Sequence, residues 1–477
     1  MSALKRATPE SQGLPSAAIS AFLTRLEAHE LHSVMVLRHG HVIAEGWWTP
    51  YQRELPHMMY SVSKSFTATA IGFAVQEGRL KVSDLVLPFF PKTHPQGDLE
   101  KMQKLTIKDL LTMSSGHDGE PQPRSANWAR DILRWPFKAE PGTTFMYNTP
   151  ATYLAGAILQ RKTRKTLVEY LTPRLFEPLG IQSRTWETDP KGLNVAGWGL
   201  YLQTEELALW GQFMLQKGQW EGQQLLPESW IAEMTAAQIS SGEDQDNDWN
   251  QGYGYQVWRC RHNTYRADGA FGQFCVVMPD QDAVVVMTAG EAVNTAGMLN
   301  AIWEELLPHF SAEALPENPQ TQAALGQQLD ALTLKGPENT TPFENQRHLN
   351  QTFTFEKNDW GLASLTLRHQ AGETTLEWTD TLGLQKIPVQ AEGWAFSESH
   401  LFQHMMWILQ DLGPWPVAAQ GGWISEDTFS VRVCLVQTPF TPTITLHFEE
   451  DRVSVDLKGA VHFGPLERPL VWGKAEG

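Results

Sequence analysis

The chain has 477 residues, 42% of them hydrophobic and 19% charged, which is typical of a globular protein with two or three domains and sizeable cores. Its formal net charge of −17 argues against a general nucleic-acid-binding surface and against an anionic-membrane surface. Three widely spaced cysteines argue against a disulfide framework or a cysteine-based zinc site. The sequence contains no run of about eighteen apolar residues, which a membrane span would need, and no evident secretory leader. We therefore expect a cytoplasmic protein.

The first predicted elements are a helix, a pair of strands and a long helix. An amphipathic helix opens at residues 14–16, because apolar residues recur at helical spacing from Ile19 to Leu26. Residues 33–37 and 42–48 are expected as strands around a short turn, and a helix follows that ends near Gly78. Further helices are expected at 104–113, 127–135, from about 150, and at 167–171, 204–216 and 227–236.

Strand patterns return after residue 252, and a helix is expected at 292–307. Residues 254–258, 274–278 and 283–287 are predicted strands. Residues 1–310 therefore predict an α+β domain in which early and late strands join one antiparallel sheet with flanking helices. Residues 311–350 are linker-like with a helical patch at 323–334, and residues 351–477 alternate with period two, which predicts a small all-β barrel or sandwich. We expect this last domain to pack on, shape or cap the first.

The motif Ser61-x-x-Lys64 combines a nucleophile with a base at the start of the long helix. One helical turn separates the two residues, so both side chains lie on the same side of the helix. A partly desolvated lysine becomes neutral and can take the proton of the serine hydroxyl, and the helix N-terminus suits a developing oxyanion. Ser2 and Lys5 have the same spacing, but chain termini are often disordered, which favours the Ser61 copy.

Other segments follow the Ser61 motif in a set order: 110–116, the Tyr147 segment 145–149, 252–255 and 268–273. Together they resemble the serine β-lactamase and penicillin-binding-protein superfamily, especially its class C-like esterase and carboxypeptidase branch, over about residues 8–310. The resemblance implies a β-lactamase/transpeptidase-like fold without a cofactor. It also implies Ser61 as the nucleophile, Lys64 and Tyr147 as partners in acid/base catalysis, and the N–H groups of Ser61 and Ala270 as oxyanion donors. Gly269 is expected to leave space for the substrate.

Two departures from the family motifs bear on the substrate. The family's Tyr-x-Asn reads Tyr147-Asn148-Thr149 here, so Thr149 is the candidate substrate-binding side chain and Asn148 is expected to point elsewhere. The family's Lys-Thr-Gly reads Ala267-Asp268-Gly269, which removes the cation that would bind a carboxylate. Asp268 is expected as a solvated strand residue. A neutral ester or amide therefore fits better than a substrate with a free carboxylate.

Three functional hypotheses follow. The first is a serine hydrolase that acts on a small-molecule ester or amide through an acyl-enzyme, with neutral esters favoured. The second is D-Ala carboxypeptidase or β-lactamase-like activity, and the third is a catalytically weak binding protein on the same fold. Residues 244–248 mimic a calcium loop, but Trp249 and Tyr255 stand where Gly and Glu are required, so no metal is expected. Three tryptophans are candidates for a substrate wall, with core packing as the simpler interpretation: Trp198, Trp249 and Trp258. The oligomeric state is left open.

Overall fold

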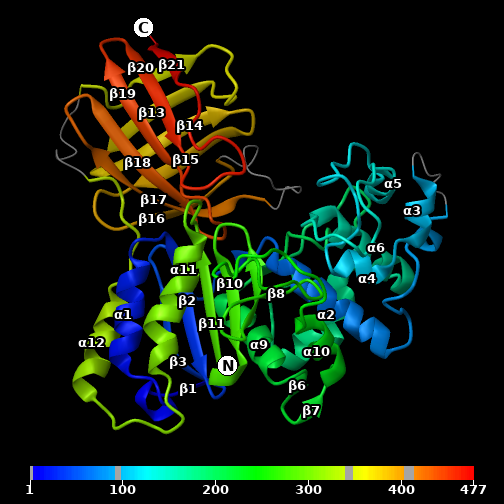
Figure 1. Cartoon of the computed structure of the whole chain (residues 1–477). Coiled ribbons are helices and arrows are strands. Elements are labelled where there is room, and N and C mark those ends of the chain that lie inside the picture. Colours follow the sequence, from blue (N-terminus) through cyan, green and yellow to red (C-terminus); the bar gives the residue numbers. More distant parts are fainter. Residues whose placement is uncertain (1–3, 92–97, 339–346, 402–412, 477) are drawn as a thin grey trace.

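A computed structural model describes residues 4–91, 98–338, 347–401 and 413–476. These residues form a mixed sheet with helices on both faces and, packed against it, an all-β domain that ends at the C-terminus (Figure 1). Two features discussed above lie outside the described residues: Ser2 of the alternative motif, and residues 339–346 of the expected linker.

The central sheet joins strands from the two ends of the first domain, as the sequence predicted. Its strand order is β1-β3-β2-β11-β10-β9-β8, and neighbouring strands are antiparallel except for the short β1, which runs parallel to β3. The strands are β1 Lys5–Arg6, β2 Leu31–Arg38, β3 His41–Trp47, β8 Trp258–Arg259, β9 Tyr265–Gly269, β10 Gln273–Met278 and β11 Ala283–Ala289.

Alternating side chains of the sheet enter two separate cores. On β10, Val276 packs in a core with α1 Ser16–Leu26 and α11 Thr295–Ala301, whereas Val277 packs in a core with α2 Val62–Gln76 and α9 Thr204–Leu215. A strand with both faces buried is rich in β-branched residues, as these strands are. No helix in the described ranges is long and apolar enough to cross a bilayer.

The remaining helices of the first domain lie beside or below the sheet, and those from α3 to α6 form a lobe to one side (Figure 1). These helices are α3 Leu99–Lys104, α4 Ile107–Leu111, α5 Trp128–Leu133, α6 Thr149–Thr163, α7 Leu167–Leu171, α8 Glu177–Leu179 and α10 Glu228–Thr235. Two small strand pairs complete the domain: β4 His57–Met58 with β5 Tyr201–Leu202, and β6 Gln219–Trp220 with β7 Gln223–Gln224.

The predicted strand at 254–258 is wrong except for its last residue. Only Trp258–Arg259 pairs in the sheet. Gln256 has a φ of 59°, which interrupts an extended strand, and its N–H donates to the carbonyl of Leu111 at 3.0 Å. Residues 254–257 therefore hydrogen-bond to neighbouring helices rather than to a strand.

The segment expected as a linker contains a helix that packs on the first domain. This helix, α12 Pro319–Asp330, buries Leu325 in the core that also holds α1. The Gln328 side chain donates to the Ser20 carbonyl at 3.3 Å, and the N–H of Leu334 donates to the carbonyl of Thr49 at 2.8 Å. The described part of this segment is thus fixed against α1 and β3.

In the described residues the C-terminal domain is a nearly closed antiparallel barrel of ten strands. Its order is β15-β14-β13-β12-β21-β20-β19-β18-β17-β16, and a hydrogen bond of 2.9 Å from Gly421 N in β17 to Gln390 O, just after β15, connects the two sides of the opening. The barrel form confirms one of the two expected architectures. The strands are β12 Thr352–Phe355, β13 Ser364–Gln370, β14 Glu373–Asp380, β15 Gly383–Val389, β16 Ala395–Ser399, β17 Trp415–Trp423, β18 Thr428–Leu435, β19 Thr443–Glu449, β20 Arg452–Lys458 and β21 Val471–Ala475.

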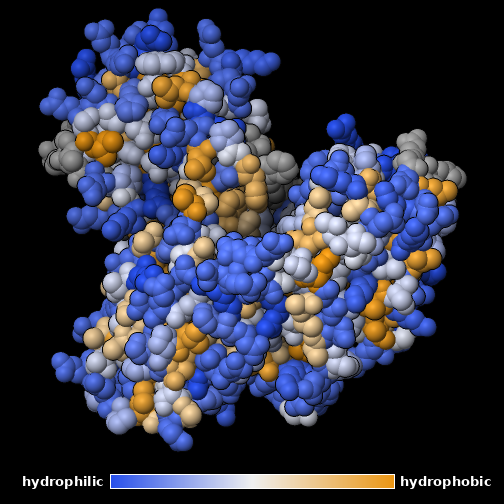
Figure 2. All heavy atoms as spheres, viewed as in Figure 1, coloured by the Kyte–Doolittle hydropathy of each residue, from blue (hydrophilic) through white to orange (hydrophobic). Residues whose placement is uncertain are grey.

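The barrel packs on the segment that leads into α2. Met58 and Tyr60 belong to the same hydrophobic cluster as the barrel's interior. Met58 N donates to the Gln437 carbonyl at 2.8 Å, and the Tyr51 hydroxyl donates to the Thr438 carbonyl at 2.8 Å. Figure 2 shows the surface hollowed between the barrel and the helical lobe, with hydrophobic residues on the barrel's side of the hollow.

Candidate active site

Ser61 is the N-cap residue of α2, directly after a strained residue. Tyr60 has a φ of 44°, in the left-handed region that costs a bulky residue about 1–3 kcal/mol. Its ring is held edge-on by Phe271 at 5.4 Å and by Phe463 at 5.5 Å between ring centroids. The barrel thus helps to fix the turn that presents the Ser61 hydroxyl at the helix N-terminus, where backbone N–H groups and the helix dipole favour negative charge.

Lys64 is buried beneath Ser61, with 1% of its surface exposed. Its Nζ lies 2.8 Å from Ser61 Oγ and donates to the carbonyl of Gly197, also at 2.8 Å. Burial lowers the pKa of Lys64 to about 7, although the negative charges of Glu120 and Asp268 oppose the shift. A large fraction of Lys64 is therefore neutral near pH 7 and able to accept the proton of Ser61 across the 2.8 Å contact.

The Tyr147 ring stacks on Trp258, with centroids 5.6 Å apart and planes inclined by 18°. Lys64 Nζ lies 5.0 Å from the centroid of the Tyr147 ring. Burial raises the pKa of Tyr147 well above its ordinary value, while a hydrogen bond with Ser61 acts in the opposite direction. The phenol therefore stays protonated and suits a proton donor, whereas neutral Lys64 suits the first base.

Ala270 lines the same cavity as Ser61, where its N–H is the candidate second oxyanion donor. Gly269 is not among the residues that line the cavity. A Cβ atom on Gly269 would lie 2.3 Å from the carbonyl oxygen of Met59, so the bare backbone lets β9 approach the chain just before Ser61. The Gln273 side chain fixes the turn after β9 by donating to the carbonyls of Ala270 and Ala289, at 3.0 and 2.7 Å.

Asn148 and Thr149 point in different directions, as the sequence suggested. Asn148 is buried and caps α6, because its Oδ1 accepts from Ala151 N at 3.0 Å and its Nδ2 donates to the Gly119 carbonyl at 3.3 Å. Thr149 lines the cavity, and its backbone N–H donates to Glu120 Oε1 at 2.9 Å.

A cavity of about 690 Å³ opens above Ser61, a size that suits a small-molecule ligand. Trp198, Trp249 and Trp258 line this cavity, although core packing was the simpler interpretation of all three. The structure therefore supports the alternative that they form a substrate wall. The cavity is lined by Tyr60, Ser61, Glu120, Pro121, Gln122, Pro123, Tyr147, Thr149, Pro150, Trp198, Trp249, Trp258, Asp268, Ala270 and Phe463.

The expectation that Asp268 is a solvated strand residue is wrong. Its side chain is only 15% exposed, lines the cavity and pairs with the fully buried Arg266, whose Nε donates to Oδ2 at 2.9 Å. The Arg266 guanidinium lies 4.5 Å from the centroid of the Trp249 ring and donates to Cys260 Sγ at 2.9 Å. A buried carboxylate needs such a partner. Asp268 therefore places a carboxylate where the threonine of the family's Lys-Thr-Gly would place a hydroxyl.

Comparison with known proteins identifies the family of the chain. A model of the Beta-lactamase family matches residues 4–303. The chain belongs to the Beta-lactamase family. It is 24% identical over 317 residues to a 6-aminohexanoate-dimer hydrolase of Paenarthrobacter ureafaciens. This alignment covers 60% of this chain and 80% of that protein.

Two other proteins that this chain resembles also have the names of hydrolytic enzymes. A protein of Salmonella paratyphi B named as a D-alanyl-D-alanine carboxypeptidase is 23% identical over 190 residues, 34% of this chain and 44% of its own length. The solved structure of EstCE1, a hydrolase with promiscuous acyltransferase activity, aligns with 60% of this chain and 100% of its own at a TM-score of 0.51 and 17% identity, a likeness of fold. The relatives support a general hydrolase role for this Beta-lactamase family member.

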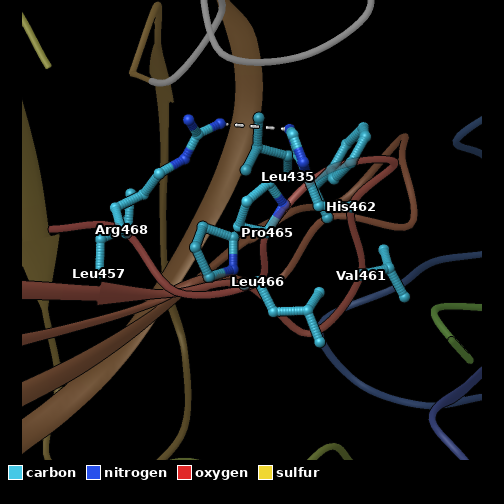
Figure 3. A pocket seen from close by; sticks show the side chains of 10 residues that line it. Leu435, Leu457, Val461, His462, Pro465, Leu466 and Arg468 are labelled. Carbon is cyan, nitrogen blue, oxygen red and sulfur yellow. Dashed lines mark hydrogen bonds between the residues drawn. The ribbon is translucent and has the colours of Figure 1, made fainter. Parts of the chain in front are cut away.

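Phe463 reaches the cavity from outside the residues that match the Beta-lactamase family. It is carried by the loop after β20, and its neighbours His462 and Pro465 line a separate small cavity of about 50 Å³ in the barrel (Figure 3). Gly464 N donates to His462 Nδ1 at 2.8 Å, and Arg468 Nη2 lies 3.4 Å from His462 Nε2. These contacts hold the loop that aims Phe463 at Tyr60.

Several residues that complete the site carried no signal in the sequence. Gly197, which holds Lys64, lies in an irregular segment far from the family motifs, and Glu120, which lines the cavity, lies in the loop that follows the segment 110–116. Among the described residues, no cluster of three or more His, Cys, Asp or Glu side chains is arranged to bind a metal.

Proposed function

We propose that this protein is a serine hydrolase that cleaves an ester or amide through an acyl-enzyme on Ser61. The observation that carries the proposal is the 2.8 Å contact between Lys64 Nζ and Ser61 Oγ, together with the burial that lowers the pKa of Lys64 to about 7. A serine hydroxyl needs a base within hydrogen-bond reach to attack a carbonyl, and Lys64 meets both the geometric and the protonation requirement.

In the proposed reaction, neutral Lys64 takes the Ser61 proton as Oγ bonds to the carbonyl carbon. The carbonyl oxygen becomes an oxyanion that accepts from the N–H groups of Ser61 and Ala270. Protonated Tyr147 donates to the leaving oxygen or nitrogen as the scissile bond breaks, and Lys64 returns a proton to Tyr147. Water then attacks the acyl-enzyme and delivers its proton to the same pair, which releases the acid and restores Ser61.

The cavity favours a substrate without a carboxylate beside the scissile bond. Ala267 stands where the family motif has a cation, and Asp268 lines the cavity with a carboxylate. Like charges placed against one another cost several kcal/mol. Esters that lack a carboxylate there are the preferred class, with amides as the harder substrates of the same site.

Parallel assays of a short-chain nitrophenyl ester, its nitroanilide and a chromogenic cephalosporin test this function. We expect the ester to have at least a tenfold higher kcat/KM than the cephalosporin, about 1.4 kcal/mol in transition-state stabilisation. The variant Ser61→Ala should abolish turnover of all three. Faster cephalosporin hydrolysis would instead support a β-lactamase, and no turnover by the wild-type chain would leave a binding protein on this fold.

A further inference from the structure

The charged side chains that line the cavity are all acidic. Glu120 and Asp268 are carboxylates, and none of the described residues that line the cavity is a lysine or arginine. The buried guanidinium of Arg266 balances one of the two negative charges from behind the wall. The Glu120 carboxylate has no such balance in the wall and leaves the cavity with a negative field.

Both carboxylates are held in place from opposite sides of the site. Glu120 accepts from the N–H of Thr149 at the start of α6, and Asp268 accepts from Arg266 at the end of β9. The charges of both carboxylates act on the same two groups, since each raises the pKa of Lys64 and of Tyr147. Both charges therefore act on the reacting groups, Asp268 from a mostly buried position and Glu120 from an exposed one.

The remaining wall includes aromatic side chains that suit an organic cation. Trp198, Trp249 and Trp258 line the cavity together with Phe463, which is 54% exposed. A cation placed over a tryptophan face is attracted by the ring quadrupole. This wall already binds one cation on its inner side, because the Arg266 guanidinium lies 4.5 Å from the Trp249 ring centroid and 5.7 Å from that of Trp258.

We infer that the cavity selects substrates in which an ammonium group is attached to an apolar body, with Glu120 and Asp268 facing the charge and the aromatic walls facing the body. This inference rests on the proposed function, because it names the substrate class of the same site. We expect the cavity to bind cationic ligands more tightly than neutral ligands of equal size, and to bind anionic ligands most weakly.

Calorimetric titration of the full chain with benzylammonium, benzyl alcohol and benzoate at pH 7.5 tests the inference. These probes share one aromatic body and differ in charge. We expect benzylammonium to bind at least tenfold more tightly than benzyl alcohol, and benzoate to bind most weakly. In Glu120→Gln the amide still accepts from Thr149, so the fold is kept, and the preference for the cation should fall to threefold or less. The control Glu398→Gln removes one exposed charge on the barrel strand β16 and should leave the preference unchanged.

Equal or tighter binding of benzyl alcohol or benzoate would overturn the inference, as would undetectable binding of benzylammonium or an unchanged preference in Glu120→Gln. Because calorimetry needs no turnover, the two proposals fail separately. Ester hydrolysis without cation preference would overturn this inference alone, whereas cation preference without hydrolysis of any substrate would overturn the proposed reaction. The Asp268→Asn variant provides a second measurement, since it too should reduce the preference for benzylammonium over benzyl alcohol.

Discussion

The ring centroid of Phe463, from the C-terminal barrel, lies 5.5 Å from the ring centroid of Tyr60, the residue directly before the candidate nucleophile. A residue more than 400 positions along the chain thus contacts the strained turn that presents Ser61. The barrel is therefore part of the candidate site as well as a neighbouring domain. This contact explains why the barrel is packed against the entrance to α2.

Replacing Phe463 by alanine should weaken the binding of bulky substrates. The ring is about half exposed, so its loss should cost about 1 kcal/mol and raise KM about fivefold for an ester with a large acyl group. Because the same ring packs on Tyr60, the kcat for a nitrophenyl acetate should fall as well. Phe396→Ala removes a similarly exposed ring elsewhere on the barrel and should change neither constant. Equal KM values for the two variants would show that Phe463 does not contact substrate.

The pH dependence of kcat/KM should report the protonation of Lys64. Burial lowers its pKa to about 7, and only the neutral amine accepts the Ser61 proton. Activity should therefore fall about tenfold per pH unit well below pH 7 and level off above it. Because the Asp268 charge raises the pKa of Lys64, Asp268→Asn should move the midpoint to lower pH. A midpoint near the ordinary lysine value, or one that moves upward in the variant, would contradict this role.

Tyr147→Phe separates proton donation from ring packing. The phenylalanine ring keeps the stack on Trp258 but cannot protonate a leaving group. For an alkyl ester or an amide, kcat should fall about 100-fold, in the range of general acid catalysis. A nitrophenyl ester should lose much less, because nitrophenolate leaves without a proton. Equal losses for both leaving groups would indicate that Tyr147 acts in another way.

Gly269→Ala should disturb the site through the backbone. The added Cβ would lie 2.3 Å from the carbonyl oxygen of Met59, so β9 or the segment before Ser61 must shift, at a cost of about 1–3 kcal/mol. Thermal unfolding should show this loss, and kcat should fall as Ala270 N–H moves. Gly326→Ala is the matched control, because no atom lies within 4 Å of the added Cβ in α12 and a helical alanine stabilises by about 1 kcal/mol. A Gly269→Ala variant as stable and active as the wild-type chain would refute the close approach.

Local patterns predicted the parts of this structure that depend on neighbouring residues. Helical spacing places Lys64 one turn after Ser61, short apolar runs predicted the inner strands of the central sheet, and alternating runs predicted strands of the barrel. The environment of Asp268 did not follow from its neighbours, because it depends on the burial of Arg266 against Trp249. The contribution of Phe463 depends on how two domains pack, for which the period of a strand carries no information.

Covalent labelling of the full chain with a fluorophosphonate, followed by peptide mass spectrometry, tests whether Ser61 is the nucleophile. We expect one adduct, on Ser61, that forms more slowly as the pH falls below about 7, where Lys64 becomes protonated. The adduct should be absent from Ser61→Ala. Labelling that persists in Ser61→Ala, or an adduct on another residue of the wild-type chain, would show that Ser61 is not the nucleophile.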